Sequence, residues 1–137
     1  MCGIVGFIGN VIGNELRSTL KNATDLLSHR GPDDEGIYVD KNFGLGFKRL
    51  AIQDLSKIGN QPMLSHDSKY IIVFNGEIYN YKILRIDLEN KGHIFYTNTD
   101  TEVLLTLYQL EGKGCLKKLN GMFSFAIIDI KNQSLFI

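Results

Sequence analysis

The sequence has no excess of charge of either sign, since its 137 residues carry 15 Lys and Arg against 15 Asp and Glu. A chain without a positive field does not attract nucleic acid or an anionic membrane surface over long range. Long apolar runs are also missing. The opening apolar segment has no basic leader and stops at Gly9, far short of the roughly 20 residues that a membrane span needs. The sequence therefore predicts no nucleic acid and no membrane among the partners.

Cysteine is scarce as well, with only Cys2 and Cys115 and no paired spacing. This pattern excludes a disulfide framework and a zinc site, and it favours a reducing cytoplasm. The three histidines are dispersed, so no two stand at metal-ligand spacing and no metal site is predicted. The segment 9–13 contains glycines but lacks the Lys-Ser/Thr that completes a phosphate-binding loop. We therefore expect no cofactor in this chain.

Repeats, low-complexity tracts and Pro/Gly/Ser linkers are absent, and 44% of the residues are hydrophobic. The chain is long enough to bury one core, so residues 1–137 are predicted to form one domain. The apolar C-terminus would leave a flat hydrophobic strand edge exposed. We therefore expect the natural domain to continue beyond Ile137, with further strands missing here.

Hydrophobic periodicity predicts alternating strands and helices, with hairpins more prominent than regular β-helix-β units. Strands are expected at residues 4–8, 37–39, 43–47 and 70–74, and in an alternating segment that begins at Phe123. Helices are expected over about 15 residues from Leu16, over 81–90, and from a capping box at 99–102. Residues 54–69 are expected to form a long loop. The pattern indicates an α+β fold.

Cys2 directly follows the initiator methionine, and cysteine is small enough for Met1 to be removed. Removal would leave a thiol and a free α-amine on the same residue. Their reference pKa values, about 8.5 and 7.7–8.0, are close enough for the amine to accept the thiol proton near neutral pH. Cys2 is therefore a candidate nucleophile that needs no catalytic histidine.

Asn75 and Gly76 follow the apolar run 70–74. The dipeptide is typical of a plain turn. It also suits an oxyanion hole, because an Asn side-chain amide and an unobstructed Gly backbone N–H supply two hydrogen-bond donors. The residues alone leave both interpretations open.

Seven motifs in order resemble the glutaminase domain of the asparagine synthetase family, a class II glutamine amidotransferase domain. They are Met1 to Gly6, His29 to Asp33, Arg49 to Ile52, Gly59 to Met63, Asn75 to Asn80, Thr99 to Glu102 and Gly121 to Ala126. The resemblance implies an N-terminal-nucleophile hydrolase fold, a four-layer αββα sandwich of two stacked antiparallel sheets flanked by helices, C-terminally incomplete. It implies that Cys2 attacks the side-chain amide of glutamine, yielding glutamate and ammonia.

The resemblance also implies roles for particular residues. The Asn75 side chain and the Gly76 backbone resemble the oxyanion hole. The remaining residues resemble the substrate pocket: Arg49 for the α-carboxylate, the backbone of Leu50 and Ile52 for the wall, and Asp100 with Glu77 for the α-ammonium. A guanidinium suits a carboxylate because its planar fork meets both oxygens.

Plainer explanations exist for several of these residues. Arg49 could be a surface charge, and Asp100 could interact with a helix dipole. Glu102 is interpreted as the capping partner of Thr99, and the turn 30–33 as a brace for the site. Cys115 is expected to be a passive, partly buried thiol.

Three alternatives stay open. The first six residues also resemble enzymes that make glucosamine 6-phosphate, whereas the later motifs favour the asparagine synthetase branch, which includes amidotransferases acting on surface sugars or antibiotic precursors. A non-catalytic glutamine-binding remnant is the third. The sequence ends before the expected Arg-Asp and Lys-Pro-Leu segment and lacks the synthetase half. That domain or subunit would bind ATP and Mg and use the ammonia to make asparagine from aspartate, and a homodimer is compatible with this assembly.

Overall fold

The computed structural model describes residues 2–9, 15–51 and 57–137. Its strands are β1 (Gly3–Ile8), β2 (Asp34–Val39), β3 (Phe43–Arg49), β4 (Met63–Leu64), β5 (Tyr70–Ile78), β6 (Gly121–Asp129) and β7 (Ser134–Phe136). Its helices are α1 (Leu16–Asp25), α2 (Tyr81–Asn90) and α3 (Asp100–Glu111), with short 3-10 segments η1 (Lys57–Gly59) and η2 (Gly112–Lys118). Within this part of the chain, no helix is long and apolar enough to cross a membrane.

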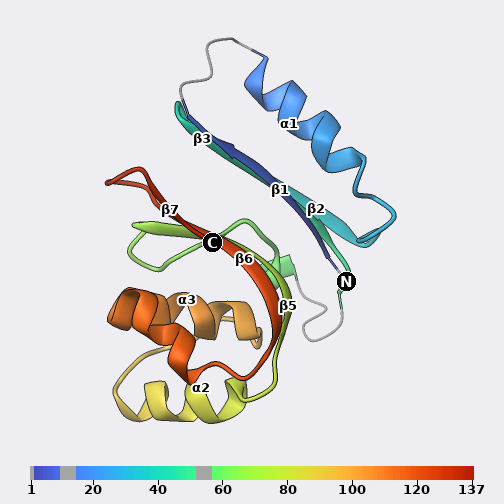
Figure 1. The fold of residues 1–137 in the computed structure, drawn as a ribbon. Helices are drawn as coiled ribbons and strands as arrows, with labels where there is room; N and C mark the ends of the chain where they lie inside the picture. The colour runs from blue at the N-terminus through green and yellow to red at the C-terminus, as the bar shows by residue number, and fades with distance from the viewer. Residues whose placement is uncertain (1, 10–14, 52–56) are drawn as a thin grey trace.

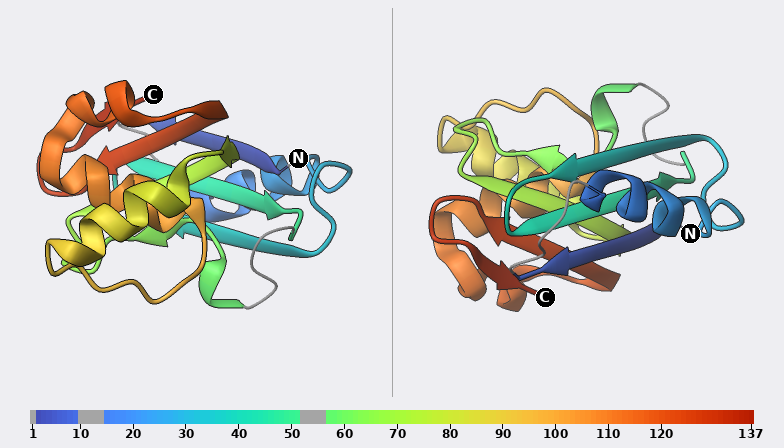
Figure 2. Two further views of the ribbon diagram at one scale, coloured as in Figure 1. Left: turned by 90° about the horizontal axis from the view of Figure 1, so that it is seen from below. Right: turned by 90° about the horizontal axis from the view of Figure 1, so that it is seen from above.

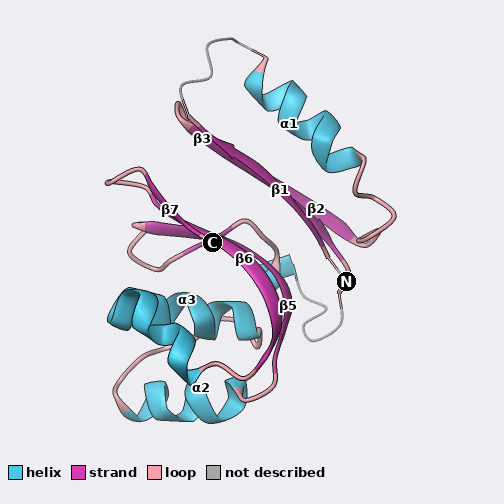
Figure 3. Cartoon of the chain, viewed as in Figure 1, coloured by secondary structure: helices cyan, strands magenta, loops and turns pink. Residues whose placement is uncertain are grey.

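The described strands form two antiparallel sheets, in the orders β1-β3-β2 and β4-β5-β6-β7. The sheets stack face to face, with α1 on the outer side of the first and α2 and α3 on the outer side of the second (Figures 1 and 3). Views from below and above show the same layers (Figure 2). The arrangement is an α+β sandwich with helix, sheet, sheet and helix layers, which confirms the predicted fold class.

The core is divided between the two faces of the second sheet. On one face, Ile72 and Phe74 pack in the cluster that contains the buried leucines of α3. On the other face, Ile71 and Val73 pack in the cluster that contains Phe43, Leu45 and Phe47 of β3. Because both faces of β5 are covered at residues 70–74, this part of the strand is continuously apolar instead of alternating. The two-residue period of the strand then puts Asn75 on the face of Val73, toward the first sheet.

The predicted helices α2 and α3 are confirmed, as are the C-cap at Gly92 and the N-cap at Thr99. The N–H groups of Gly92 and His93 donate to the carbonyls of Glu89 (2.9 Å) and Leu88 (3.0 Å), and Gly92 has a φ of +90°. This is the hydrogen-bond pattern of a Schellman C-cap, which favours glycine. At α3, the Thr99 hydroxyl accepts the Glu102 N–H at 3.3 Å, the first half of a capping box.

Helix α1 is shorter than predicted, ending at Asp25 after 10 residues. The N–H groups of Leu27 and Ser28 bond to carbonyls only three residues back, Thr24 and Asp25, at 3.0 Å each. Such three-residue bonds tighten the chain into turns before Gly31 and Pro32 are reached. The apolar spacing continued through Leu27, but the helix did not.

The predicted loop 54–69 was also partly wrong, because η1 and β4 lie within it, whereas residues 52–56 lie outside the described part of the chain. Strand β5 in turn extends beyond the predicted residue 74 to Ile78. Asn75 and Gly76 stay paired with Ser124 and Phe123 of β6. The plain-turn interpretation of this dipeptide is therefore wrong, and both residues belong to a strand.

Candidate active site

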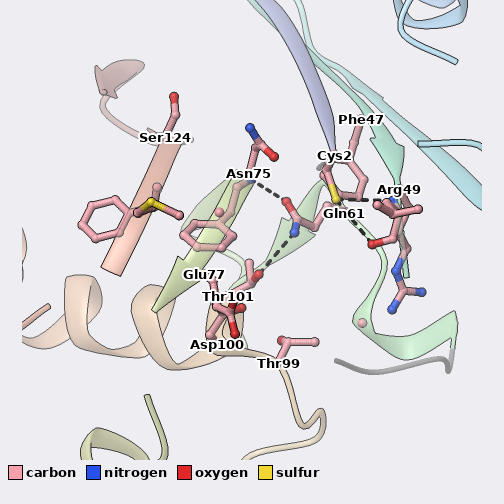
Figure 4. A pocket seen from close by; sticks show the side chains of 16 residues that line it. Cys2, Phe47, Arg49, Gln61, Asn75, Glu77, Thr99, Asp100, Thr101 and Ser124 are labelled. Atoms are coloured by element: carbon pink, nitrogen blue, oxygen red, sulfur yellow. Dashed lines mark hydrogen bonds between the residues drawn. The ribbon is translucent and has the colours of Figure 1, made fainter. Parts of the chain in front are cut away.

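A cavity of about 380 Å³ opens where the two sheets meet the N-terminus of α3 (Figure 4). Segments from six parts of the chain line it: the start of β1, the end of β3, the segment before β4, the end of β5, the first turn of α3 and the start of β6. The lining residues are Cys2, Phe47, Arg49, Leu50, Gly59, Gln61, Phe74, Asn75, Gly76, Glu77, Thr99, Asp100, Thr101, Met122, Phe123 and Ser124. Seven of the eight site residues predicted from the sequence are among them, and the eighth, Ile52, lies outside the described residues.

Cys2 stands immediately before β1 with its side chain half-buried at this cavity. The Leu50 N–H donates to the Cys2 Sγ at 3.4 Å, and the thiol lies 3.7 Å from the Leu50 carbonyl oxygen. The Arg30 Nε donates to the Cys2 carbonyl oxygen at 3.1 Å. Backbone and sulfur of Cys2 are thus both held by residues that are distant in sequence.

The turn 30–33 braces the same region, as predicted. The Asp33 N–H donates to the Arg49 carbonyl at 3.0 Å, and the Asp33 carboxylate accepts the Ala51 N–H at 2.8 Å. A Cβ on Gly31 would lie 2.5–2.6 Å from backbone atoms of Lys48 and Arg49. Because only glycine allows this approach, the turn fixes the end of β3, where Arg49 stands.

Asn75 and Gly76 bring hydrogen-bonding groups to the opposite wall of the cavity. The Asn75 Oδ1 is buried and has no hydrogen-bond partner among the described residues. Such an orphaned acceptor costs about 1–3 kcal/mol, and native structures retain few of them. Gly76 has a φ of +156°, and a Cβ there would lie 2.5 Å from the Phe123 Cα. The strand is therefore built for a residue without a side chain at this point.

Arg49 and Asp100 bring opposite charges to the cavity lining, and their exposed fractions are only 6% and 5%. The Asp100 Oδ2 accepts the Ile78 N–H at 2.9 Å. Burial raises the pKa of Asp100, the nearby Glu77 charge adds to that rise, and backbone N–H bonds only partly oppose it. The carboxylate at the start of α3 is thus short of positive charge, and a cation entering the cavity would stabilise it.

Several lining residues were not predicted from the sequence, chiefly Gln61, Thr101 and Ser124. Gln61 lies inside one of the recognised motifs, which was the available signal, but nothing local gave it a role. Ser124 stands directly opposite Asn75 in the β5–β6 register. Its place in the cavity depends on strand pairing, which the local sequence does not specify.

Glu102 corrects the predicted capping pair. Its carboxylate does not return to the Thr99 N–H but accepts the N–H groups of Tyr96 (3.0 Å) and Thr97 (2.7 Å) and pairs with His66 at 2.9 Å. Burial alone would raise the pKa of Glu102, but these hydrogen bonds outweigh it and lower the pKa below its ordinary value. Glu102 therefore stabilises the loop before α3 and does not line the cavity.

Neither the second cysteine nor a metal-ligand cluster provides a further site in the described part of the chain. Cys115 is completely buried, more than predicted, and burial raises the pKa of its thiol. A thiol held in the protonated form is a poor nucleophile, which agrees with a passive role. Residues 2–9, 15–51 and 57–137 contain no group of three His, Cys, Asp or Glu side chains arranged to hold a metal ion.

Two antiparallel sheets between helix layers, with a cysteine directly before the first strand facing a cavity, form the architecture expected of an N-terminal-nucleophile hydrolase fold. The comparisons with known proteins agree. Residues 1–137 match the family described as "Glutamine amidotransferase domain", and the chain belongs to that family.

Curated relatives include asparagine synthetase [glutamine-hydrolyzing] 2 and 1 of Bacillus subtilis, 41% and 43% identical over 100% and 93% of this chain. Asparagine synthetase B of Escherichia coli is 38% identical over 100% of the chain. The chain spans 18%, 20% and 24% of these proteins' lengths. A solved glutamine phosphoribosylpyrophosphate amidotransferase from B. subtilis superposes over 93% of this chain and 35% of its own, with a TM-score of 0.75. At 24% identity it supports the fold alone.

Proposed function

We propose that this domain hydrolyses the side-chain amide of glutamine to glutamate and ammonia, with Cys2 as the nucleophile. The observation that carries the proposal is the joint lining of the cavity, where a thiol, an Asn-Gly pair, a buried arginine and a buried aspartate meet. Each group suits one requirement of the reaction: a nucleophile, donors for the oxyanion, a cation for the α-carboxylate and an anion for the α-ammonium. The proposal treats residues 1–137 as part of a glutamine amidotransferase domain.

In the proposed reaction, removal of Met1 exposes the α-amine of Cys2, which takes the proton of the thiol. The Cys2 Sγ attacks the amide carbon of glutamine, and a C–S bond forms. The amine returns the proton to the leaving nitrogen as the C–N bond breaks, so ammonia departs and a thioester remains. Water then attacks the thioester, the C–S bond breaks, and glutamate and the thiol are regenerated. The general base and the nucleophile thus belong to one residue.

The Asn75 amide and the Gly76 N–H are proposed to stabilise the oxyanion in both tetrahedral intermediates. Losing one such donor typically costs about 2.7–4 kcal/mol of transition-state stabilisation. Arg49 is proposed to bind the α-carboxylate. The backbone of Leu50 and Ile52 is proposed to form the wall of the pocket beside it. Asp100, with Glu77 beside it, is proposed to accept the α-ammonium, which fits its buried carboxylate.

We further propose that the ammonia passes to a synthetase domain or subunit that binds ATP and Mg and converts aspartate to asparagine, in the cytoplasm. The support is that these relatives are glutamine-hydrolysing asparagine synthetases, each longer than this chain. The reaction within this chain is proposed to draw only on its own residues and water, without a cofactor. A Ser-Gly-Gly-x-Asp-Ser pyrophosphate loop in the parent gene would support the synthetase, and an aminotransferase domain in its place would contradict it.

The test of the glutaminase proposal is glutamate release from glutamine by the full-length parent protein and by two variants of it, because the 137-residue piece alone is expected to turn over glutamine poorly or not at all. Cys2→Ala removes the nucleophile and should abolish turnover, whereas Cys115→Ala removes the other thiol, which lies outside the cavity, and should retain it. Intact-mass measurement shows whether Met1 has been removed. Equal glutamate release by the wild type and Cys2→Ala would contradict the proposal, as would turnover by a chain that retains Met1.

A further inference from the structure

Gln61 is the buried amide that connects two walls of the cavity, and only 6% of the residue is exposed. Its Oε1 accepts the Phe74 N–H at 2.5 Å. Its Nε2 donates to the Thr101 Oγ1 at 3.2 Å. Figure 4 draws both bonds as dashed lines across the cavity. One side chain therefore ties strand β5 to the first turn of α3.

The bond to Phe74 replaces a missing rung of the sheet. Strand β4 pairs Met63 with Ile72 and Leu64 with Ile71, and this register would place Gln61 opposite Phe74. The strand begins only at Met63, and the intervening Pro62 has no N–H to donate. Without a partner, the buried Phe74 N–H would pay the desolvation cost of an unsatisfied donor. The Gln61 side chain supplies the acceptor at the residue directly before Asn75.

The two ends of this bridge stand next to the two halves of the proposed site. Phe74 precedes Asn75, the proposed oxyanion donor on β5, and Thr101 follows Asp100, the proposed ammonium acceptor on α3. The Ile78 N–H bond to Asp100 joins the strand and the helix at another point. Gln61 and Asp100 thus give two polar links between β5 and the start of α3, in addition to the apolar packing of these two elements.

We propose that Gln61 is a positioning residue for glutamine hydrolysis, whose amide sets the separation between the oxyanion donors on β5 and the ammonium acceptor at the start of α3. The proposal rests on the proposed glutaminase function. Gln61 acts through Phe74 and Thr101, and its effect is on the geometry in which the substrate meets Cys2.

Gln61→Met tests the bridge, because methionine has a similar length and volume but can make neither hydrogen bond. A displacement of about 1 Å in a catalytic group can cost about 10²-fold in rate. We therefore expect kcat to fall about tenfold to a hundredfold. Thr101→Val removes only the helix end of the bridge, so it should raise the KM for glutamine more than it lowers kcat. Adding Thr101→Val to Gln61→Met should change the kinetics by less than about twofold, since the bond is already gone.

Helix α3 offers matched controls. Gln109 also donates its amide to another segment, to the Asp67 Oδ1 at 3.0 Å, and the Thr106 hydroxyl donates to the Glu102 carbonyl at 2.9 Å. Neither residue lines the cavity. Gln109→Met and Thr106→Val should therefore keep kcat and KM within about twofold of the wild type. Thermal unfolding of every variant shows whether a kinetic change merely follows the folded fraction.

Hydrogen exchange at the Phe74 amide reads the bridge without using activity. Gln61→Met should accelerate exchange at Phe74, while Thr101→Val should leave it near the wild-type rate. The positioning proposal is overturned if Gln61→Met is folded and keeps wild-type kinetics, if the α3 controls lose as much activity, or if Phe74 exchange is unchanged. Failure of the glutaminase proposal looks different, because the wild type itself would then show no Cys2-dependent turnover.

Discussion

Gly76→Ala is the sharpest perturbation of the proposed oxyanion hole. The new Cβ would lie 2.5 Å from the Phe123 Cα and closer still to the Met122 carbonyl oxygen, both backbone atoms of the paired strand. Real Cβ contacts essentially never fall below 3.0 Å, so the strands must separate by more than the roughly 0.5 Å that the Phe123 contact alone requires. The φ of +156° adds strain for any residue with a side chain.

The displacement falls on the N–H that is proposed to donate to the oxyanion. Loss of one such donor costs about 10²–10³ in kcat, while overpacking of this kind costs about 1–3 kcal/mol in stability. We therefore expect Gly76→Ala to remain folded at low temperature but to lose at least about a hundredfold in kcat, with a smaller change in the KM for glutamine.

The assay is steady-state glutamate release, with urea unfolding to measure stability. Gly114→Ala is the control, because the nearest atom to its new Cβ is 3.9 Å away and no backbone strain is involved. This variant should match the wild type in kcat. If Gly76→Ala is folded and keeps kcat within about threefold of the wild type, the oxyanion assignment is wrong.

Three further predictions concern the charged groups around the cavity. Asp100→Asn should raise the KM for glutamine about tenfold to a hundredfold, the value of one charged hydrogen bond. Because burial raises the folded-state pKa of Asp100, its charge costs stability above that pKa. Asp100→Asn should therefore raise the melting temperature at pH 7, with no gain below the unfolded pKa of about 3.9. Glu102 has a lowered pKa, so its carboxylate stabilises the fold above its ordinary value of 4.5 and loses this effect as the pH falls through the lowered pKa. Glu102→Gln should reduce the free energy of unfolding by about 1–3 kcal/mol at pH 7 in urea titrations, and a cost that stays the same at acidic pH would contradict the reasoning. Arg30→Met frees the Cys2 carbonyl and should lower kcat about tenfold with little change in KM, which steady-state kinetics would show.

Local signals predicted the elements whose structure is locally determined. The turn-rich residues 40–42 do connect β2 and β3, and Gly92 and Thr99 cap the ends of α2 and α3. Capping needs only neighbours within one helical turn, so the order of residues suffices. The prediction failed where distant partners decide, as in the strand β4 and the extension of β5 through Asn75.

The candidate site likewise divides into features that the local sequence determines and features that distant residues determine. The thiol at position 2, the Asn-Gly pair and the motif order could be recognised in the sequence, because they are properties of residue type and spacing. Glu102 was assigned to the Thr99 cap from spacing alone, but its carboxylate found better donors in the loop before the helix. A buried carboxylate takes the hydrogen bonds that the fold offers, and these are not fixed by a four-residue motif.

The sequence by itself determined which chemical groups are available: a nucleophile that can carry its own base, amide donors, and one charge of each sign for a zwitterion. Only the tertiary structure decided which groups meet. The bonds from Arg30 to Cys2, from Gln61 to Phe74 and from Gln61 to Thr101 join residues 28, 13 and 40 positions apart. No periodicity along the chain encodes such pairs, because they form only when the two sheets and α3 pack together and leave these polar groups no other partner.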